Sequence, residues 1–157
     1  MGRDEEDLTS VLVVNGPHYT KEDCRDHECI AAIIHKDDKI LMMDHVKMNR
    51  WAVPVGKIKS GESKEYTLKQ EMKEELDINI IKYEEIISFT RPYIVNGISV
   101  KVKYHIFDIL EYIGKIKNLE PNKHKSLKFS SIDELKKLKR ISTATKAFLR
   151  YRRDDVF

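Results

Sequence analysis

The chain has 157 residues, of which 41% are hydrophobic and 35% are charged, and its formal net charge is +3. This composition is typical of a globular protein with a real core, and the charge is too small to require a nucleic-acid or membrane partner. A membrane span needs about 18 consecutive apolar residues, and the sequence has no such run. The acidic N-terminus also lacks the apolar segment of a signal peptide. We therefore expect a cytoplasmic protein with one domain over residues 1–157, including a short N-terminal extension over about residues 1–25.

The first elements in chain order are short and extended. A strand is expected at 10–16, where the run SVLVV ends at Asn-Gly-Pro. Two apolar runs within 29–46 flank Lys36-Asp37-Asp38-Lys39, and this pattern predicts a hairpin. Residues 49–56 are expected to be extended, because Pro54 disfavours helix at the preceding residue.

The later elements combine helices with a second hairpin. Residues 80–90 are strand-like, and Asn96-Gly97 marks a tight turn within the predicted hairpin at 93–110. Helices are expected at 63–76, 130–140 and 141–153. Together the elements predict an α+β fold, arranged as an α/β/α sandwich around a mixed β-sheet.

The helix at 63–76 carries three closely spaced carboxylates. With about 100° per residue, Glu71, Glu74 and Glu75 lie on one face of this helix. An apolar stripe runs beside them, formed by Leu68, Met72 and Leu76. Like charges at this spacing cost a few tenths of a kcal/mol per pair, so a solvated acidic face is one interpretation. The other is a divalent-cation site, because Mg²⁺ binds one or two carboxylates together with phosphate oxygens and waters.

The residues before the helix favour the cation site. Gly56 and Gly61 allow the backbone to approach a ligand closely. Arg50, Lys57 and Lys59 place positive charge where phosphate groups could bind. We therefore predict that Arg50 and Lys57 bind phosphate.

These residues resemble the Nudix box, G-x5-E-x7-R-E-U-x-E-E-x-G-U, where U is apolar. The glycine and all four glutamates of the pattern are present at Gly56, Glu62, Glu71, Glu74 and Glu75. The preceding RWAVPVGK is similar to the family lead-in W-x-x-P-G-G-K. The sequence departs from the pattern at three positions, which are Val55, Gln70 and Asp77. Asp77 falls at the helix end, where a left-handed backbone is expected.

The resemblance implies a role for each matched residue. Glu74 and Glu75 would be the principal Mg²⁺ or Mn²⁺ ligands, and the Gly56 carbonyl and Glu71 would complete the site. Glu71 is also the candidate general base, and the three carboxylates Glu71, Glu74 and Glu75 are the predicted catalytic residues. Glu62 would brace the loop. The segment NLEPNKHK resembles the N-x-E-P-x-K stretch of MutT-like nucleoside triphosphate pyrophosphatases, which makes Glu120 a further candidate metal ligand.

A nucleotide base needs aromatic or apolar walls and a few polar groups. Possible walls also include Tyr104 and Phe129, but we predict Trp51, Phe89 and Tyr93 as the walls. His45, Asn96 and His105 are candidates for reading the edges of the base.

Three functions remain open. The resemblance implies hydrolysis of a nucleoside diphosphate linked to another group, with a small-molecule nucleoside triphosphate releasing pyrophosphate as the first hypothesis. The second is RNA 5′-end decapping, supported by the basic stretches KKLKR (136–140) and RYRR (150–153). The third is a catalytically inactive nucleotide-binding module, supported by Gln70 in place of the family arginine. Nothing in the sequence decides whether the protein forms a homodimer.

Overall fold

The computed structural model describes residues 8–155. The strands are β1 (Leu12–Val14), β2 (His27–Lys36), β3 (Lys39–His45), β4 (Arg50–Ala52), β5 (Val55–Lys57), β6 (Asn79–Val95), β7 (Ile98–Ile113) and β8 (His124–Ser131). The helices are the 3-10 turn η2 (Glu22–Cys24), α1 (Lys64–Leu76), α2 (Ile132–Lys137) and α3 (Thr143–Asp155).

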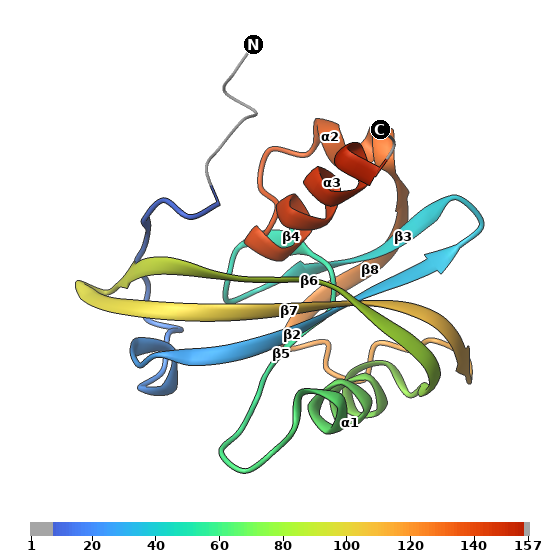
Figure 1. Cartoon of the computed structure of the whole chain (residues 1–157), viewed down its shortest axis with the longest axis horizontal. Coiled ribbons are helices and arrows are strands. Elements are labelled where there is room, and N and C mark those ends of the chain that lie inside the picture. Colours follow the sequence, from blue (N-terminus) through green and yellow to red (C-terminus); the bar gives the residue numbers. More distant parts are fainter. Residues whose placement is uncertain (1–7, 156–157) are drawn as a thin grey trace.

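The sheet is mixed. Its strands follow the order β1-β6-β7-β2-β3-β4, while β5 pairs with β2 and β8 pairs with β3. The β1–β6 and β2–β7 pairs are parallel, and the other pairs are antiparallel. Helix α1 lies on one side of the sheet, and α2 and α3 lie on the other (Figure 1). The predicted α/β/α arrangement around a mixed sheet is therefore confirmed.

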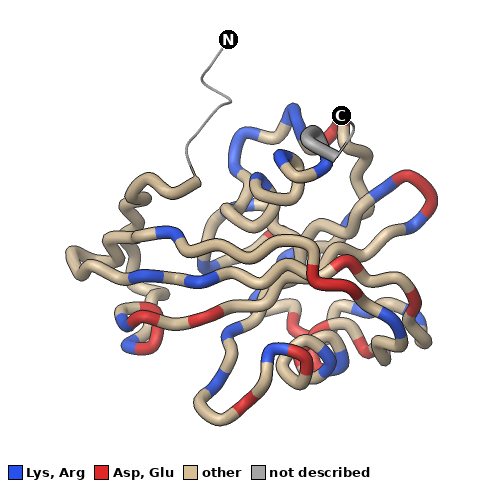
Figure 2. The backbone as a smooth tube through the Cα atoms, in the orientation of Figure 1, with Lys and Arg blue, Asp and Glu red and all other residues tan. Residues whose placement is uncertain are grey.

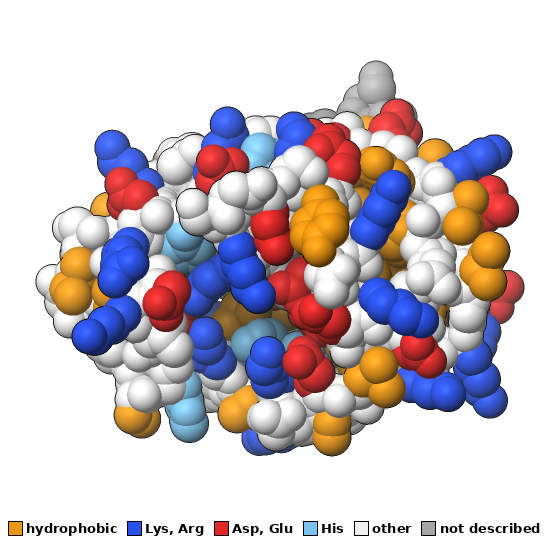
Figure 3. Space-filling model, turned by 90° about the horizontal axis from the view of Figure 1, so that it is seen from below, with side chains coloured by type: hydrophobic (Ala, Val, Ile, Leu, Met, Phe, Trp, Pro, Cys, Tyr) orange, Lys and Arg blue, Asp and Glu red, His pale blue; other side chains and the backbone are white. Residues whose placement is uncertain are grey.

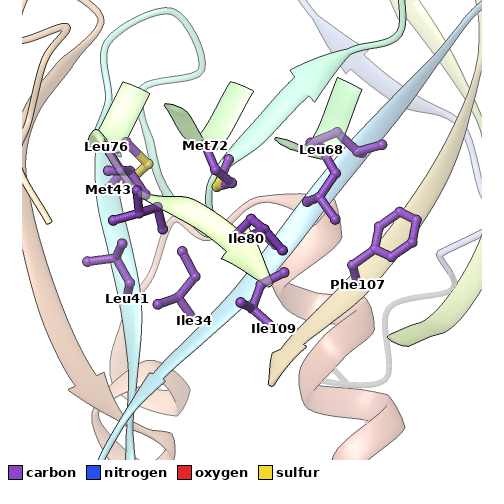
Figure 4. Close-up of a cluster of buried hydrophobic side chains, with 12 residues drawn as sticks. Ile34, Leu41, Met43, Leu68, Met72, Leu76, Ile80, Phe107 and Ile109 are labelled. Carbon is purple, nitrogen blue, oxygen red and sulfur yellow. The ribbon is translucent and has the colours of Figure 1, made fainter. Parts of the chain in front are cut away.

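The apolar stripe of α1 packs on the sheet. Leu68, Met72 and Leu76 are fully buried. Figure 4 shows these side chains directed at residues of β2, β3, β6 and β7, among them Ile34 and Phe107. Fully burying an aliphatic side chain of this size contributes about 1.5–3 kcal/mol. This packing fixes the rotation of α1 about its axis, and with it the direction of the carboxylates.

Both ends of α1 are specified locally. The Ser63 hydroxyl accepts a hydrogen bond from the Tyr66 N–H at 3.0 Å and so caps the first turn. At the other end, Asp77 has φ 60° and ψ 39°, and its N–H donates to the Lys73 carbonyl. The expected left-handed backbone at Asp77 is confirmed.

The hairpins form where the turn residues predict them, but β6 is longer than expected. The predicted strand at 80–90 continues without a break through Pro92 to Val95. Proline is tolerated there because β1 pairs with β6 only from Tyr93 onward, so β6 is an edge strand at Pro92. The helix expected at 130–140 is also shorter than predicted, since α2 ends at Lys137.

The C-terminal basic stretches lie around α2 and α3, across the sheet from α1 (Figure 2). The α3 helix begins after Ser142, whose hydroxyl accepts a hydrogen bond from the Thr145 N–H at 3.3 Å. Over residues 8–155, no helix is long and apolar enough to cross a membrane.

Candidate active site

A cavity of about 510 Å³ opens between α1, β5, the N-terminal segment and the start of α3. Figure 3 views the molecule from the α1 side and shows a hollow with hydrophobic side chains at its floor and charged and histidine side chains at its rim. We call one part the carboxylate end, formed by Gly56, Glu71, Glu75 and His124, and the other the aromatic end, formed by Tyr19, Tyr93, Tyr104 and Thr143. The volume suits a small organic ligand.

Glu71 and Glu75 meet at the carboxylate end. Glu75 is only 4% exposed, and its Oε1 atom has no hydrogen-bond partner. The His124 Nε2 atom lies 4.0 Å from that oxygen, but burial lowers the pKa of His124, so its ring does not supply a compensating positive charge at neutral pH. Glu71 covers Gly56 so closely that a Cβ atom at position 56 would lie 2.5 Å from the Glu71 Cγ atom. Only glycine leaves Glu71 this position.

The two carboxyl groups are held in an unfavourable environment. Burial, followed by repulsion from Glu71, raises the pKa of Glu75 well above its usual range. Burial also raises the pKa of Glu71. A buried carboxylate oxygen that has no hydrogen-bond donor is a favourable ligand for a hard divalent cation. The cation is coordinated by carboxylate oxygens, and its positive charge offsets their repulsion. The donor set therefore fits Mg²⁺ or Mn²⁺.

The other predicted ligands have different partners. Glu74 is exposed, and its Oε2 atom accepts a hydrogen bond from Gln70 Nε2 at 2.8 Å. The Leu119 N–H donates to the Glu75 carbonyl at 3.0 Å, which holds Glu120 beside α1. The Glu120 carboxylate lies 3.4 Å from the Lys123 ammonium group. Within the described chain, no three acidic, histidine or cysteine side chains are already gathered as metal ligands.

The loop before α1 is braced as expected. Glu62 Oε1 accepts hydrogen bonds from the Lys59 N–H at 3.3 Å and from the Thr67 hydroxyl at 2.9 Å. These bonds tie the glycine-containing turn to the first turn of the helix.

Positive side chains line the cavity near the carboxylates. Arg50 and Lys57, both predicted to bind phosphate, are among them, and Lys47 and Lys123 are two more. Sequence reasoning missed Lys47, which stands in no motif. It also gave no role to Lys123, although this residue is the lysine of the N-x-E-P-x-K stretch. It also missed His124, which the Asn118 side chain helps to fix by donating to the His124 carbonyl at 2.8 Å.

Asp23 is a further cavity residue that sequence reasoning missed. It is 7% exposed and forms ion pairs with both Lys47 and Lys57. Burial raises the pKa of Asp23, but hydrogen bonds from Lys57, the Thr20 N–H and Lys47 outweigh this effect and hold that pKa well below its usual range. Asp23 is therefore ionised at neutral pH.

Only one of the three predicted base walls lines the cavity. The Tyr93 hydroxyl contacts the Tyr104 hydroxyl and donates to Thr143 Oγ1 at 2.8 Å. Trp51 packs in the core on the α3 side, with the Lys128 ammonium 4.5 Å from its ring centroid. Phe89 stacks on Tyr104, with ring centroids 5.2 Å apart, and lies outside the lining of the cavity.

The three residues predicted to read the edges of the base lie in different environments. His45 lines the cavity, and burial lowers its pKa to about 4, so it is neutral there. His105 is buried between Glu28 and Glu85. The Asn96 side chain accepts a hydrogen bond from the Gly16 N–H and donates one to the Gly16 carbonyl. It therefore links the β6–β7 turn to the N-terminal segment.

Comparison with known proteins gives a consistent picture. A family model described as the NUDIX domain matches residues 25–151. A search of curated proteins finds no match. Among solved structures, the chain is similar to a MutT NUDIX hydrolase from Burkholderia pseudomallei, with 22% identity, a TM-score of 0.69 and coverage of 80% of this chain and 97% of that one.

Two other solved structures share the fold. The ORF135 protein of E. coli has 25% identity and a TM-score of 0.66, with 85% of this chain and 92% of that chain covered. An Ap4A hydrolase from C. elegans has 17% identity and a TM-score of 0.59, with 83% and 97% covered.

Proposed function

This chain belongs to the NUDIX family of hydrolases that act on phosphoanhydride bonds, and from that premise we propose that it is a Mg²⁺- or Mn²⁺-dependent enzyme for small nucleotides. The proposed reaction is hydrolysis of a nucleoside triphosphate with release of pyrophosphate. The observation that carries the proposal is the Glu71–Glu75 pair beside Gly56, in which Glu75 is buried, Glu71 is half-buried and one Glu75 oxygen has no partner. Burial and mutual repulsion of two carboxyl groups destabilise the folded protein, and a purely structural role does not explain why this pair is placed here.

Glu71 and Glu75 would hold the cation with the Gly56 carbonyl. Glu74 and Glu120 lie outside the cavity lining, but in addition to burial their charges raise the pKa of Glu71, and they remain further candidates. When bound, the cation supplies charge stabilisation to phosphate oxygens and lowers the pKa of a bound water. Glu71 lines the cavity beside Gly56 and Glu75, where a metal-bound water would stand. Glu71 therefore remains the proposed general base.

The cationic side chains are proposed to bind the phosphate chain. Arg50, Lys47 and Lys57 line the same cavity as the two ends. Their positive charges oppose the charge of a polyphosphate, and their N–H groups donate to its oxygens. A triphosphate extending from the aromatic end would thus reach the carboxylates.

The aromatic end is proposed to bind the base. Tyr93 and Tyr19 offer ring surface, and Val95 and Val102 provide an apolar floor beside them. The Thr143 hydroxyl accepts hydrogen bonds from Tyr93 and Arg91 and keeps its own proton to donate to a base. The His45 ring packs against His124, with ring centroids 5.2 Å apart, and so lies at the carboxylate end. This assignment retains Tyr93 from the predicted walls.

The test is a substrate panel in the presence of Mg²⁺. It contains the nucleoside triphosphates, ADP-ribose, dinucleoside polyphosphates and a 5′-triphosphorylated RNA, and release of pyrophosphate or phosphate is measured. We expect turnover of at least one nucleoside triphosphate that is abolished in Glu75→Gln. Turnover of RNA alone would favour decapping instead, and no turnover of any compound would leave a binding module.

A further inference from the structure

Asp23 joins three separate parts of the chain at the edge of the cavity. It lies in η2, whereas Lys57 lies in β5 and Lys47 in the loop between β3 and β4. The Lys47 ammonium is 3.0 Å from Asp23 Oδ2, and the Lys57 ammonium contacts Asp23 Oδ1. The two lysine side chains are about one-third exposed, at 32% and 30%, and both line the cavity.

The carboxylate is itself firmly held. Asp23 Oδ2 accepts a hydrogen bond from the Thr20 N–H at 2.7 Å and another from the Thr20 hydroxyl at 3.2 Å. In return, the Asp23 N–H donates to that hydroxyl at 3.3 Å. The position of Asp23 is thus set by its own turn, independently of the lysines.

The turn is attached to the rest of the protein through the β6–β7 hairpin. Strand β1 pairs with the end of β6, Gly16 bonds to Asn96, and the Lys101 N–H donates to Asp26 at 2.9 Å. Asp23 lies just outside the NUDIX match, which begins at residue 25. The family match therefore does not cover this residue.

Two adjacent ammonium groups repel each other unless an anion lies between them. Asp23 supplies that anion and leaves each ammonium with further N–H donors, since a lysine has three. We propose that Asp23 is a positioning residue that holds Lys47 and Lys57 side by side for the oxygens of a polyphosphate chain. This inference rests on the proposed function, because it assigns the phosphate-binding part of the same cavity.

The positioning role of Asp23 and the net charge of the cavity predict opposite effects of Asp23→Asn on anion affinity. Asp23→Asn makes the cavity more positive by one unit, so a diffuse field would bind anions more tightly. If Asp23 positions the lysines, the same change releases them and weakens binding. The test is to measure the Kd of inorganic tripolyphosphate by titration calorimetry with Mg²⁺ present. We expect the Kd of Asp23→Asn to be about tenfold higher than that of the wild-type protein.

The matched control is Glu22→Gln. Glu22 is the neighbouring carboxylate in η2, fully exposed, so its change removes the same charge one residue away. Its Kd for tripolyphosphate should stay within about twofold of the wild-type value, because charged groups in water are screened. A tenfold effect in both variants would overturn the inference.

A background that lacks both lysines separates positioning from folding. In Lys47→Met/Lys57→Met, adding Asp23→Asn should change the Kd no further. A persistent loss in that background would show that Asp23 acts through the fold, and would contradict the inference. If Asp23→Asn does not fold, Thr20→Val loosens the same carboxylate without changing charge and should raise the Kd a few-fold; an unchanged Kd there would also contradict it.

The outcomes distinguish this inference from the proposed function. Nucleotide hydrolysis with a Kd that is unchanged or lower in Asp23→Asn overturns the inference alone. A weakened Kd in Asp23→Asn without hydrolysis of any nucleotide overturns the proposed function alone. With an active enzyme, Asp23→Asn should raise KM more than it lowers kcat, because ground-state contacts to the phosphates are lost.

Discussion

The carboxylate end of the cavity comes mostly from one short stretch of chain, whereas the aromatic end is assembled from three distant segments. Gly56, Glu71 and Glu75 lie within twenty residues of one another, on β5 and α1. Tyr19 comes from the N-terminal segment, Tyr93 and Tyr104 from the β6–β7 hairpin, and Thr143 from α3. The difference teaches that the proposed chemistry depends on local spacing, while ligand selection depends on how distant elements pair.

The largest expected effect breaks the carboxylate end. Glu75→Gln should lower kcat/KM by at least about 10³-fold, because it removes a charged ligand from the proposed cation site. Without metal, the melting temperature should stay the same or rise, since an amide avoids the cost of a buried carboxylate and can donate to Glu71. Steady-state kinetics and thermal melts measure the two effects.

The matched control for that change lies on the same helix. Glu65→Gln alters a first-turn carboxylate away from the cavity and should leave kcat/KM within about twofold. Equal losses in the two variants would mean that α1 charge in general, and not the buried pair, supports activity.

The next effect concerns Gly56, whose lack of a side chain leaves room for Glu71. Gly56→Ala places a Cβ atom against Glu71 and should displace that side chain, lowering kcat by about 100-fold while the fold persists. Gly16→Ala is the control, because the nearest atom to its new Cβ would be 3.7 Å away, on Tyr19. Activity of Gly56→Ala close to wild type would show that the position of Glu71 does not matter.

A smaller effect concerns the aromatic end. Tyr93→Phe removes the hydroxyl that contacts Tyr104 and Thr143, and should raise KM for a nucleoside triphosphate by about three- to tenfold with little change in kcat. The Kd of tripolyphosphate should not change, because that ligand has no base. Phe89→Leu, outside the cavity lining, serves as the control for KM. A rise in the tripolyphosphate Kd of Tyr93→Phe would show that Tyr93 also affects phosphate binding, and would contradict the separation of the two ends.

The smallest effect concerns Gln70, which departs from the family pattern. Gln70 donates to Glu74, so an arginine there would form a charge-assisted bond to the same carboxylate. Gln70→Arg should raise kcat a few-fold, measured under saturating Mg²⁺ and nucleotide. A slower enzyme would indicate that glutamine is adapted to this site.

Sequence reasoning worked where the physical cause is local. The helical period placed Leu68, Met72 and Leu76 on the buried face of α1, and the turn chemistry of Asn96-Gly97 placed a hairpin. The left-handed residue Asp77 followed from its place at the helix end.

It could not place side chains whose position is set by long-range pairing. Trp51 and Phe89 are aromatic residues at plausible positions, yet sheet pairing directs them away from the cavity lining. Asp23 stood in an unremarkable polar stretch, and only the attachment of the N-terminal segment to β6 brings it to Lys47 and Lys57. No local pattern encodes such a meeting of three segments.

If Glu71 and the buried Glu75 form a divalent-cation site, thermal unfolding with and without Mg²⁺ should reveal it. A ligand that binds only the folded state raises stability by RT ln(1 + [L]/Kd). With no nucleotide present, Mg²⁺ should raise the melting temperature of the wild-type protein in a saturable way and leave that of Glu75→Gln unchanged. The same shift in both proteins, or none in the wild type, would contradict the account.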